Sequence, residues 1–277
     1  MSTLSYHEKV TVNELQMMPT PPPTSTHVPI PHYTAVTEIL NQLDKMGYEY
    51  TNLDVGVSHE QQRAYWMMDL ENKSIARDWG TTIGGWNSHD KVLRYSIVAG
   101  PKFYICANQW ITGEIKVATK HTSKIMQRLP RMVTRALFKL SQHDKVNTER
   151  IAHYKEYEMP HENWVFHPEG DNQGATKVFD SSPQIHDMVV RSLDLGIINS
   201  SSVQQVLKEW REPRYEAFEP RNAWTLCNAY TEVFKKYSNP LQLSERGIKL
   251  TAMLDNEVGY EAPALAEMPE DEEIIVN

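Results

Sequence analysis

The sequence predicts an α+β protein, in which an antiparallel β-meander packs with a long basic helix and is followed by a helical C-terminal half. Three observations lead to this fold class. Five segments rich in aromatic and β-branched residues lie between residues 48 and 111, and their connections are too short for crossover helices. The region 116–157 contains few helix-breaking residues. Signals for further helices follow residue 183.

The core begins with a helix that Thr34 can cap, with Val36, Ile39 and Leu43 on one face and Gly47 at its end. The predicted strands are 48–58, 63–71, 78–85, 93–99 and 103–111, with a turn at Gly100, Pro101 and Lys102 between the last two.

The long helix is predicted over 116–157, with Pro130 as a kink or as the first residue of a second helix. Further helices are predicted over 183–196, from 203 to near Trp210, over 221–237 and over 243–254. The C-terminal half is therefore expected to be helical.

Composition divides the 277 residues into five parts. They are an extended Pro-rich N-terminal arm (1–32), an α+β core domain (33–158), a loop insertion (159–182), a helical region (183–256) and an acidic disordered tail (257–277). Six prolines between residues 19 and 31 fix φ and remove donors, which predicts an extended arm.

The overall composition narrows the class of protein. A hydrophobic content of 40% and a charged content of 23% are typical of globular proteins. No apolar run approaches the roughly 18 residues of a transmembrane helix, and residues 1–10 lack the apolar region of a signal peptide. Since two cysteines cannot form a disulfide framework, we expect a cytoplasmic protein.

A stripe of cations marks the predicted long helix. Its members recur at steps of four, three, four and four residues, and we call them the basic stripe: Lys124, Arg128, Arg131, Arg135 and Lys139. The neighbouring apolar face consists of Ile125, Leu129, Val133, Ala136 and Leu140. Lys116, Lys120 and His121 extend the stripe upstream. No acid at i,i+4 pairs with the stripe, so we favour phosphates of a nucleic acid as its partners. A partner elsewhere in the chain and a plain solvated surface stay open.

The net charge of −8 argues at first against nucleic acid, because phosphate contacts need cations. The charge is unevenly spread, however. Residues 101–140 hold eight Lys or Arg and one acid, Glu114, for a local charge of +7. Residues 261–277 hold six acids and no base. We therefore expect the tail to screen the basic stripe, with a plain solubilising end as the alternative.

The segment that joins the third and fourth predicted strands adds candidate ligands. Asn87 and Lys91 are candidate nucleic-acid contacts. Trp86, Tyr104 and Trp110 are candidates for stacking on bases, although strand aromatics more often belong to a core. A structural turn is the simpler interpretation of the polar residues.

An enzyme is the alternative for the same segment. His89 would be a general base, with Asp90 as its orienter or as a metal ligand. The sequence lacks the zinc spacings, the phosphate-binding loop, the dinucleotide fingerprint and the serine nucleophile elbow. We therefore predict no metal and no cofactor, lean towards a non-enzymatic protein, and expect Cys106 to be a buried packing residue.

Three long segments carry a family resemblance. They are PTPPPTSTHVPIPH, GGWNSHDKVLRYSIVAGPKFYICANQWITGEIKVATKHT and EWREPRYEAFEPRNAWTLCNAYTEVFK. Between Pro19 and Leu254 the chain resembles the phage- and plasmid-encoded family known as domain of unknown function 932. The resemblance implies a mobile-element protein, made by a bacteriophage in the cytoplasm of its bacterial host. It implies no activity.

The signatures of that family match named positions of this chain. They are Asn87 to Lys91, then Lys120 to Thr122, and then Arg221, Trp224, Asn228, Thr231 and Glu232. The chain departs from the family at Val92, where a small polar residue is expected, and at Ala107, where an aspartate is expected. The resemblance also implies that the loop 159–180 is an insertion relative to other members of the family.

Together these features predict a DNA-transaction protein that binds or anneals single-stranded nucleic acid in replication or recombination. The predicted contact residues are Lys116, Lys120, His121, Lys124, Arg128, Arg131, Arg135, Trp86, Asn87, Lys91, Tyr104 and Trp110. The alternatives are a host-takeover or anti-defence factor, which binds a host or phage protein through its tail or arm, and the enzyme described above. No membrane partner is expected, and a homo-oligomer is left open.

Overall fold

The computed structural model describes residues 8–71, 79–104, 106, 108–159, 183–237 and 240–268. Its centre is a six-stranded antiparallel sheet in the order β1-β2-β3-β4-β5-β6. The strands are β1 (Glu8–Lys9), β2 (Tyr50–Ser58), β3 (Arg63–Leu70), β4 (Trp79–Ser88), β5 (Tyr95–Phe103) and β6 (Lys116–Thr119). The predicted α+β fold with an antiparallel meander is confirmed.

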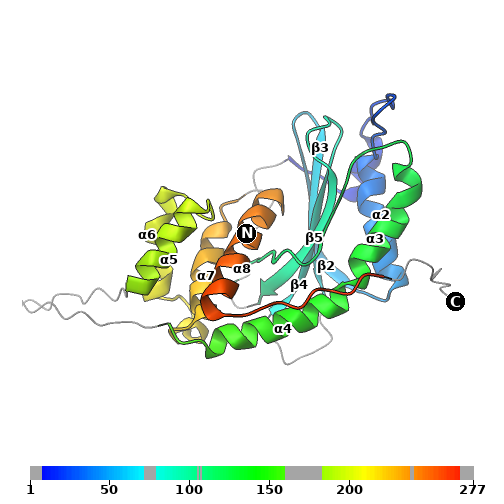
Figure 1. The fold of residues 1–277 in the computed structure, drawn as a ribbon. Coiled ribbons are helices and arrows are strands. Elements are labelled where there is room, and N and C mark those ends of the chain that lie inside the picture. The colour runs from blue at the N-terminus through cyan, green and yellow to red at the C-terminus, as the bar shows by residue number, and fades with distance from the viewer. Residues whose placement is uncertain are drawn as a thin grey trace, which may run out of the picture.

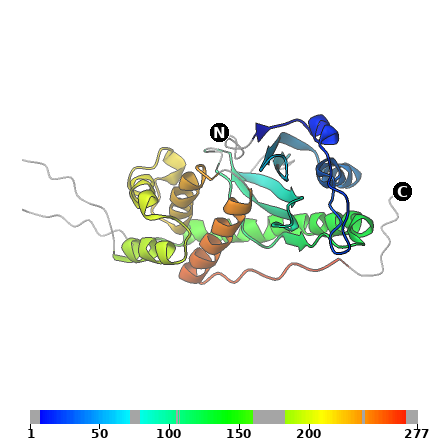
Figure 2. The same ribbon diagram turned by 90° about the horizontal axis from the view of Figure 1, so that it is seen from above.

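Helices cover both faces of this sheet (Figures 1 and 2). On one face, α2 (His32–Lys45) and α3 (Ile125–Phe138) pack against alternate strand residues such as Trp66 and Ile83. On the other face, α7 (Ala223–Phe234) and α8 (Pro240–Val258) pack against the intervening residues, such as Tyr65 and Trp86. The sheet is therefore the middle layer of three.

The predicted fifth strand, 103–111, is wrong. Strand β5 continues through Gly100, Pro101 and Lys102, the predicted turn, and the chain then leaves the sheet. A Cβ on Gly100 would lie 1.9 Å from the carbonyl oxygen of Trp110, so only glycine lets the next segment cross this closely. Trp110 turns toward α8, where its Nε1 donates to Thr251 Oγ1 at 3.0 Å.

The last strand, β6, lies in a region predicted as helix. It pairs antiparallel with β5, from Lys116 opposite Val98 to Thr119 opposite Tyr95. The predicted long helix is two helices, α3 and α4 (Leu140–Glu156), which meet at Lys139. Pro130 lies inside α3 and begins no new helix.

The predicted arm contains a helix that was not predicted, and α2 begins at His32 after Pro31 and not after a Thr34 cap, whereas the C-terminal helices follow the prediction closely. Short helix α1 (Val12–Met17) lies between β1 and α2. In the C-terminal half, α5 (Pro183–Asp194) and α6 (Val203–Arg211) precede α7 and α8. The predicted loop insertion lies outside the described residues, except for its first residue, Met159.

One face of the sheet shares a hydrophobic cluster with the C-terminal helices, so the predicted core domain (33–158) and helical region (183–256) pack directly against each other. Helix α4 runs beneath the sheet from α3 to the α7 side (Figure 1). Buried Arg150 of α4 joins Glu114, which precedes β6, to Asp255 of α8. The parts are thus tied together by ion pairs as well as by apolar contacts.

The chain beyond α8 is ordered as far as the structure describes it, which corrects the predicted start of the disordered tail at 257. Residues 259–268 run along α4 toward the end of α3 (Figure 1). The Tyr260 hydroxyl donates to Val146 O at 3.2 Å, and the Ala266 amide donates to Gln142 Oε1 at 2.7 Å. The acids at 270–273 lie outside the described residues.

Candidate functional site

Helix α3 places the basic stripe on its outer side. Its apolar residues, among them Ile125, Leu129 and Val133, are fully buried against α2 and the sheet. Lys124, at the N-cap of α3, is exposed on the opposite side. Arg128 and Arg131 are also exposed, whereas Arg135 and Lys139 are half-buried. The predicted amphipathic helix is thus present, with its cations facing outward.

The upstream half of this surface carries uncompensated positive charge. Lys116, Lys120, Lys124 and Arg128 are exposed and form no ion pair with any described residue. The chain contains no acid from Ile115 to His143. Solvated cations of this kind can neutralise the phosphates of a nucleic acid and release counterions.

The downstream end of the basic stripe meets the acidic end of the chain. Lys139 Nζ lies 2.5 Å from Glu267 Oε1. Leu265 and Met132 pack against the same apolar cluster that holds α3. The expected contact between tail and stripe is therefore present at one ion pair.

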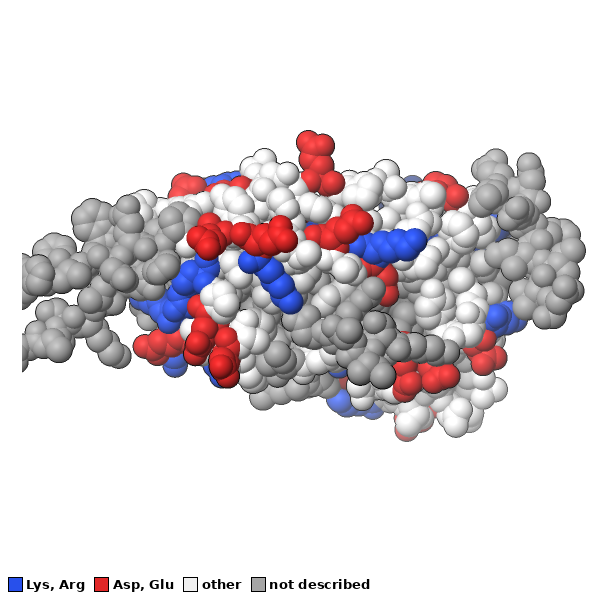
Figure 3. All heavy atoms as spheres, turned by 90° about the horizontal axis from the view of Figure 1, so that it is seen from below, with Lys and Arg blue, Asp and Glu red and all other residues white. Residues whose placement is uncertain are grey.

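The underside of the molecule is not a basic surface. Figure 3 shows the underside of Figure 1, where α4 and residues 259–268 lie, with acidic and basic side chains interspersed.

The predicted stacking role of Trp86 and Trp110 is wrong. Trp86 is 3% exposed and Trp110 is 0% exposed, and both belong to the core beneath α7 and α8. Helices cover both faces of the sheet, so a base cannot reach these rings. Tyr104 is 51% exposed, but the segment after it packs on α7, across the sheet from α3.

The segment between β4 and β5 is an ordered turn. Asp90 forms an ion pair with Arg63 at 2.6 Å and accepts a hydrogen bond from the Val92 amide at 3.1 Å. Burial raises the pKa of Asp90, but hydrogen bonds from Ser88, the Val92 amide and Arg63 outweigh it and lower the pKa overall. Lys91 is exposed and adopts a φ of 65° at the tip.

The alternative His89–Asp90 catalytic pair is not formed. The Asp90 carboxylate is held by Arg63 and the turn, while His89 Nε2–H donates to the carbonyl of Ile30 at 2.8 Å. His89 is 5% exposed, and burial is the main cause of its lowered pKa. Asp90 therefore orients the turn and not the imidazole.

A cluster of imidazoles joins three of the sequence motifs, at the end of the sheet where α2 and α3 begin. We call it the histidine corner, and it consists of His27, His32, Asn87, His89 and His121. The rings of His32 and His89 stack with centroids 3.8 Å apart, and those of His27 and His121 stack at 5.0 Å. The Pro-rich arm, the β4–β5 turn and the start of α3 thus meet.

Main-chain groups of the arm hold the histidine corner together. Asn87 Nδ2 donates to Ile30 O at 2.7 Å and to His32 Nδ1 at 2.9 Å. His32 Nε2–H donates to Gln61 O at 3.0 Å. Asn87 is fully buried and both hydrogens of its Nδ2 are used in these bonds, while its predicted role as a nucleic-acid contact stays a prediction. The Val28 amide donates to His121 O at 3.0 Å.

The rings of the histidine corner are neutral at pH 7. Burial lowers the pKa of His32 to about 3 and that of His121 to about 4. Each is lowered further by a neighbouring ring, His89 for His32 and His27 for His121. The sequence signal for His27 and His32 is the motif HVPIPH at the end of the Pro-rich arm.

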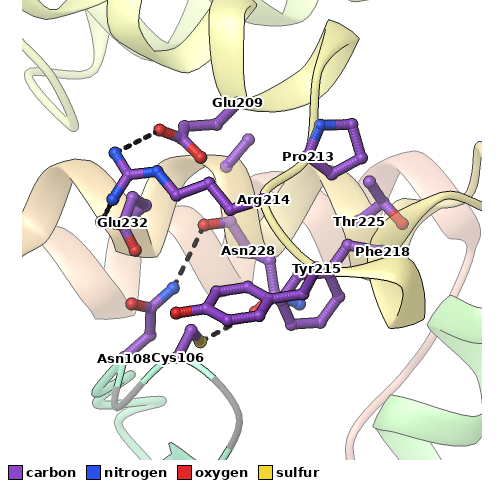
Figure 4. A pocket seen from close by; sticks show the side chains of 11 residues that line it. Cys106, Asn108, Glu209, Pro213, Arg214, Tyr215, Phe218, Thr225, Asn228 and Glu232 are labelled. Carbon is purple, nitrogen blue, oxygen red and sulfur yellow. Dashed lines mark hydrogen bonds and ion pairs between the residues drawn. The ribbon is translucent and has the colours of Figure 1, made fainter.

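Asn228 and Glu232 of the third family signature line a separate narrow cavity on the α7 side (Figure 4). Arg214 lies between two carboxylates, 2.6 Å from Glu209 and 3.0 Å from Glu232. Cys106 and Asn108 close the inner end, and the cavity is barely wide enough for one water molecule. Glu209 and Arg214 lie in the third segment of the family resemblance, but ion pairs that join separate elements leave no local pattern by which their pairing could be predicted.

Cys106 has the packing role that its sequence predicted. It is 5% exposed, and burial raises the pKa of its thiol to about 11. A thiol with so high a pKa carries almost no thiolate at neutral pH.

Within the described residues, no three His, Cys, Asp or Glu side chains are arranged to hold a metal ion. None of the described helices is both long and apolar enough to cross a membrane. The resemblance to the family of domain of unknown function 932 stays a prediction. Comparisons with models of protein families, with curated proteins and with solved structures found no match for this chain.

Proposed function

We propose that this protein binds single-stranded nucleic acid through its backbone phosphates, along the outer side of α3, as part of a DNA transaction such as replication or recombination. The observation that carries the proposal is the set of exposed cations without ion pairs on β6 and α3, in a stretch without acids. Successive members of the stripe lie about 4.5 to 6 Å apart along the helix axis, a spacing that allows contacts to several phosphates.

The buried aromatic rings define the kind of binding that we propose. With Trp86 and Trp110 in the core, affinity comes from cations and phosphates and not from stacked bases. Binding of this kind depends weakly on sequence and strongly on salt. We therefore expect similar affinities for homopolymers of different bases.

The test is the affinity of the protein for labelled single-stranded DNA and for labelled duplex DNA, measured by fluorescence anisotropy. Lys124→Gln with Arg128→Gln removes two exposed cations of the stripe. The matched control is Lys145→Gln with Lys208→Gln, which removes two exposed cations from α4 and α6 and causes the same change in net charge.

We expect the stripe variant to lose about tenfold or more in affinity for single strands, and the control to lose much less. Equal losses would show only that net charge matters, and would contradict a site on α3. A duplex bound more tightly than a single strand would contradict the single-strand assignment.

A further inference from the structure

The histidine corner contains buried polar atoms that no described residue satisfies. They are Asn87 Oδ1, His89 Nδ1, His27 Nε2 and both ring nitrogens of His121. His121 is 4% exposed and Asn87 is 0% exposed. Buried polar groups in native proteins almost always have a hydrogen-bond partner, so this concentration of unpartnered atoms points to a bound group.

The bonds already formed determine what that group must offer. His89 Nε2–H donates to Ile30 O, so Nδ1 of the neutral ring has a lone pair and accepts. Both hydrogens of Asn87 Nδ2 are used, which leaves Oδ1 as an acceptor. Neutral His121 has one donor and one acceptor. A matching ligand therefore has to donate and accept hydrogen bonds.

The electrostatic surroundings favour an anion. Helices α2 and α3 both begin at the histidine corner (Figure 1), and neither first turn is capped by a side chain. Among charged groups, Lys91 acts on His27 and Asp90 acts on His89. The negative charge of Asp90 is balanced by its ion pair with Arg63, so Lys91 leaves a net positive charge near the histidine corner.

A phosphate monoester can both donate and accept hydrogen bonds, with one proton for one of the unpartnered acceptors. Its second pKa is about 6, so near neutral pH it can carry a proton to donate while its other oxygens accept. A phosphate diester and a sulfate ion have no such proton. We propose that the histidine corner binds the terminal phosphate of a nucleic-acid strand whose internal phosphates lie along α3.

The position of His121 brings the two contacts close together, because this residue lies three positions before Lys124, the N-cap of α3. This inference rests on the proposed function for the identity of the strand. The phosphate site itself can be tested without any nucleic acid.

The first experiment compares oligonucleotides of one sequence that end in a 5′-phosphate, a 3′-phosphate or hydroxyls only. We expect one phosphorylated end to bind about tenfold more tightly than the hydroxyl form. The preference should grow between pH 8 and pH 6, as the site takes up a proton. His121→Phe should abolish the preference for the phosphorylated end. His186→Phe, an exposed histidine on α5, is the matched control.

The second experiment uses inorganic phosphate and sulfate as probes of the full chain, with the melting temperature and the NMR signals of the histidine rings as readouts. Phosphate should raise the melting temperature and shift the ring signals, while sulfate should do neither at the same ionic strength. Lys91→Asn tests the charge without disturbing the interior, since asparagine tolerates the positive φ at this position.

The outcomes separate the two proposals. If hydroxyl and phosphorylated strands bind equally, the inference about the histidine corner is overturned and the proposed function stands. If no strand binds, the proposed function fails, and the comparison of phosphate with sulfate then tests by itself whether the histidine corner binds phosphate. Equal effects of phosphate and sulfate, unchanged by His121→Phe, would overturn the phosphate site.

Discussion

Arg150 is 1% exposed and bonds to groups from separate parts of the chain. Its Nε donates to Asp255 Oδ1 at 3.0 Å, its Nη1 donates to Asn147 Oδ1 at 2.9 Å, and its Nη2 pairs with Glu114. Burial disfavours the charge, but the two carboxylates outweigh it and raise the pKa of Arg150. The residue therefore joins α4, α8 and the segment before β6.

Replacing Arg150 with methionine should lower the free energy of unfolding by about 3–5 kcal/mol, because two carboxylates lose their buried partner. Urea denaturation measures the change. Lys145→Met, on the exposed side of the same helix, should stay within about 0.5 kcal/mol of the wild type. A loss below about 1 kcal/mol for Arg150→Met would mean that water enters the site and compensates the carboxylates.

The histidine corner should make stability depend on pH. The pKa of His121 is about 4 in the folded protein and about 6.5 in an unfolded chain. Above pH 6.5 both states are neutral, and the full stability is present. Below it the unfolded state binds the proton first, so the free energy of unfolding falls by about 1.4 kcal/mol per pH unit for each such ring until the folded pKa is reached.

His121→Phe should therefore flatten the pH dependence by one proton between pH 6 and pH 4.5, measured by urea denaturation in acetate buffers without phosphate. His186→Phe should leave the slope unchanged, because this ring is exposed. Identical slopes for the wild type and His121→Phe would contradict a neutral buried ring.

Among the elements, those with a local pattern were predictable from the sequence. The apolar face and the cations of α3 follow from a helical period within one segment. Strands β2 to β5 follow from runs of aromatic and β-branched residues. Strand β6 was not predictable in this way, because Lys116–Thr119 is a strand only through its pairing with β5.

The features that were not predicted correctly depend on contacts between segments that are distant in the sequence. The segment after Phe103 has the composition of a strand, yet Asn108 and Trp110 bond to Thr231 and Thr251 of two C-terminal helices. Likewise, the sequence cannot show that the arm brings His32 onto His89, two residues that lie 57 positions apart in the sequence. Partners that are remote in sequence leave no signal in a local window.

At the scale of the whole molecule, the three-layer arrangement decides which residues can meet a ligand. Both faces of the sheet are covered, so strand aromatics serve the core and the cations of α3 remain at the surface. The net charge of −8 is likewise a poor guide, since the stretch from Ile115 to His143 has no acid. The distribution of charge, and not its sum, supports the proposed function.

The acidic C-terminal end should weaken nucleic-acid binding, because Glu267 already pairs with Lys139 of the stripe. Deleting residues 261–277 removes six acids and should tighten binding of single strands about three- to tenfold at low salt, with little effect at high salt, where charges are screened. Anisotropy titrations at two salt concentrations measure this. Unchanged affinity would mean that the end only keeps the protein soluble.

The central claim is that the cations of α3 contact phosphates, and the salt dependence of single-strand binding tests it most directly. The logarithm of the association constant should fall linearly with the logarithm of the salt concentration, with a slope of about −0.7 for each phosphate contacted. Lys124→Gln with Arg128→Gln should reduce the magnitude of that slope by about 1.4, since two contacts are lost. An unchanged slope in this variant would contradict the claim.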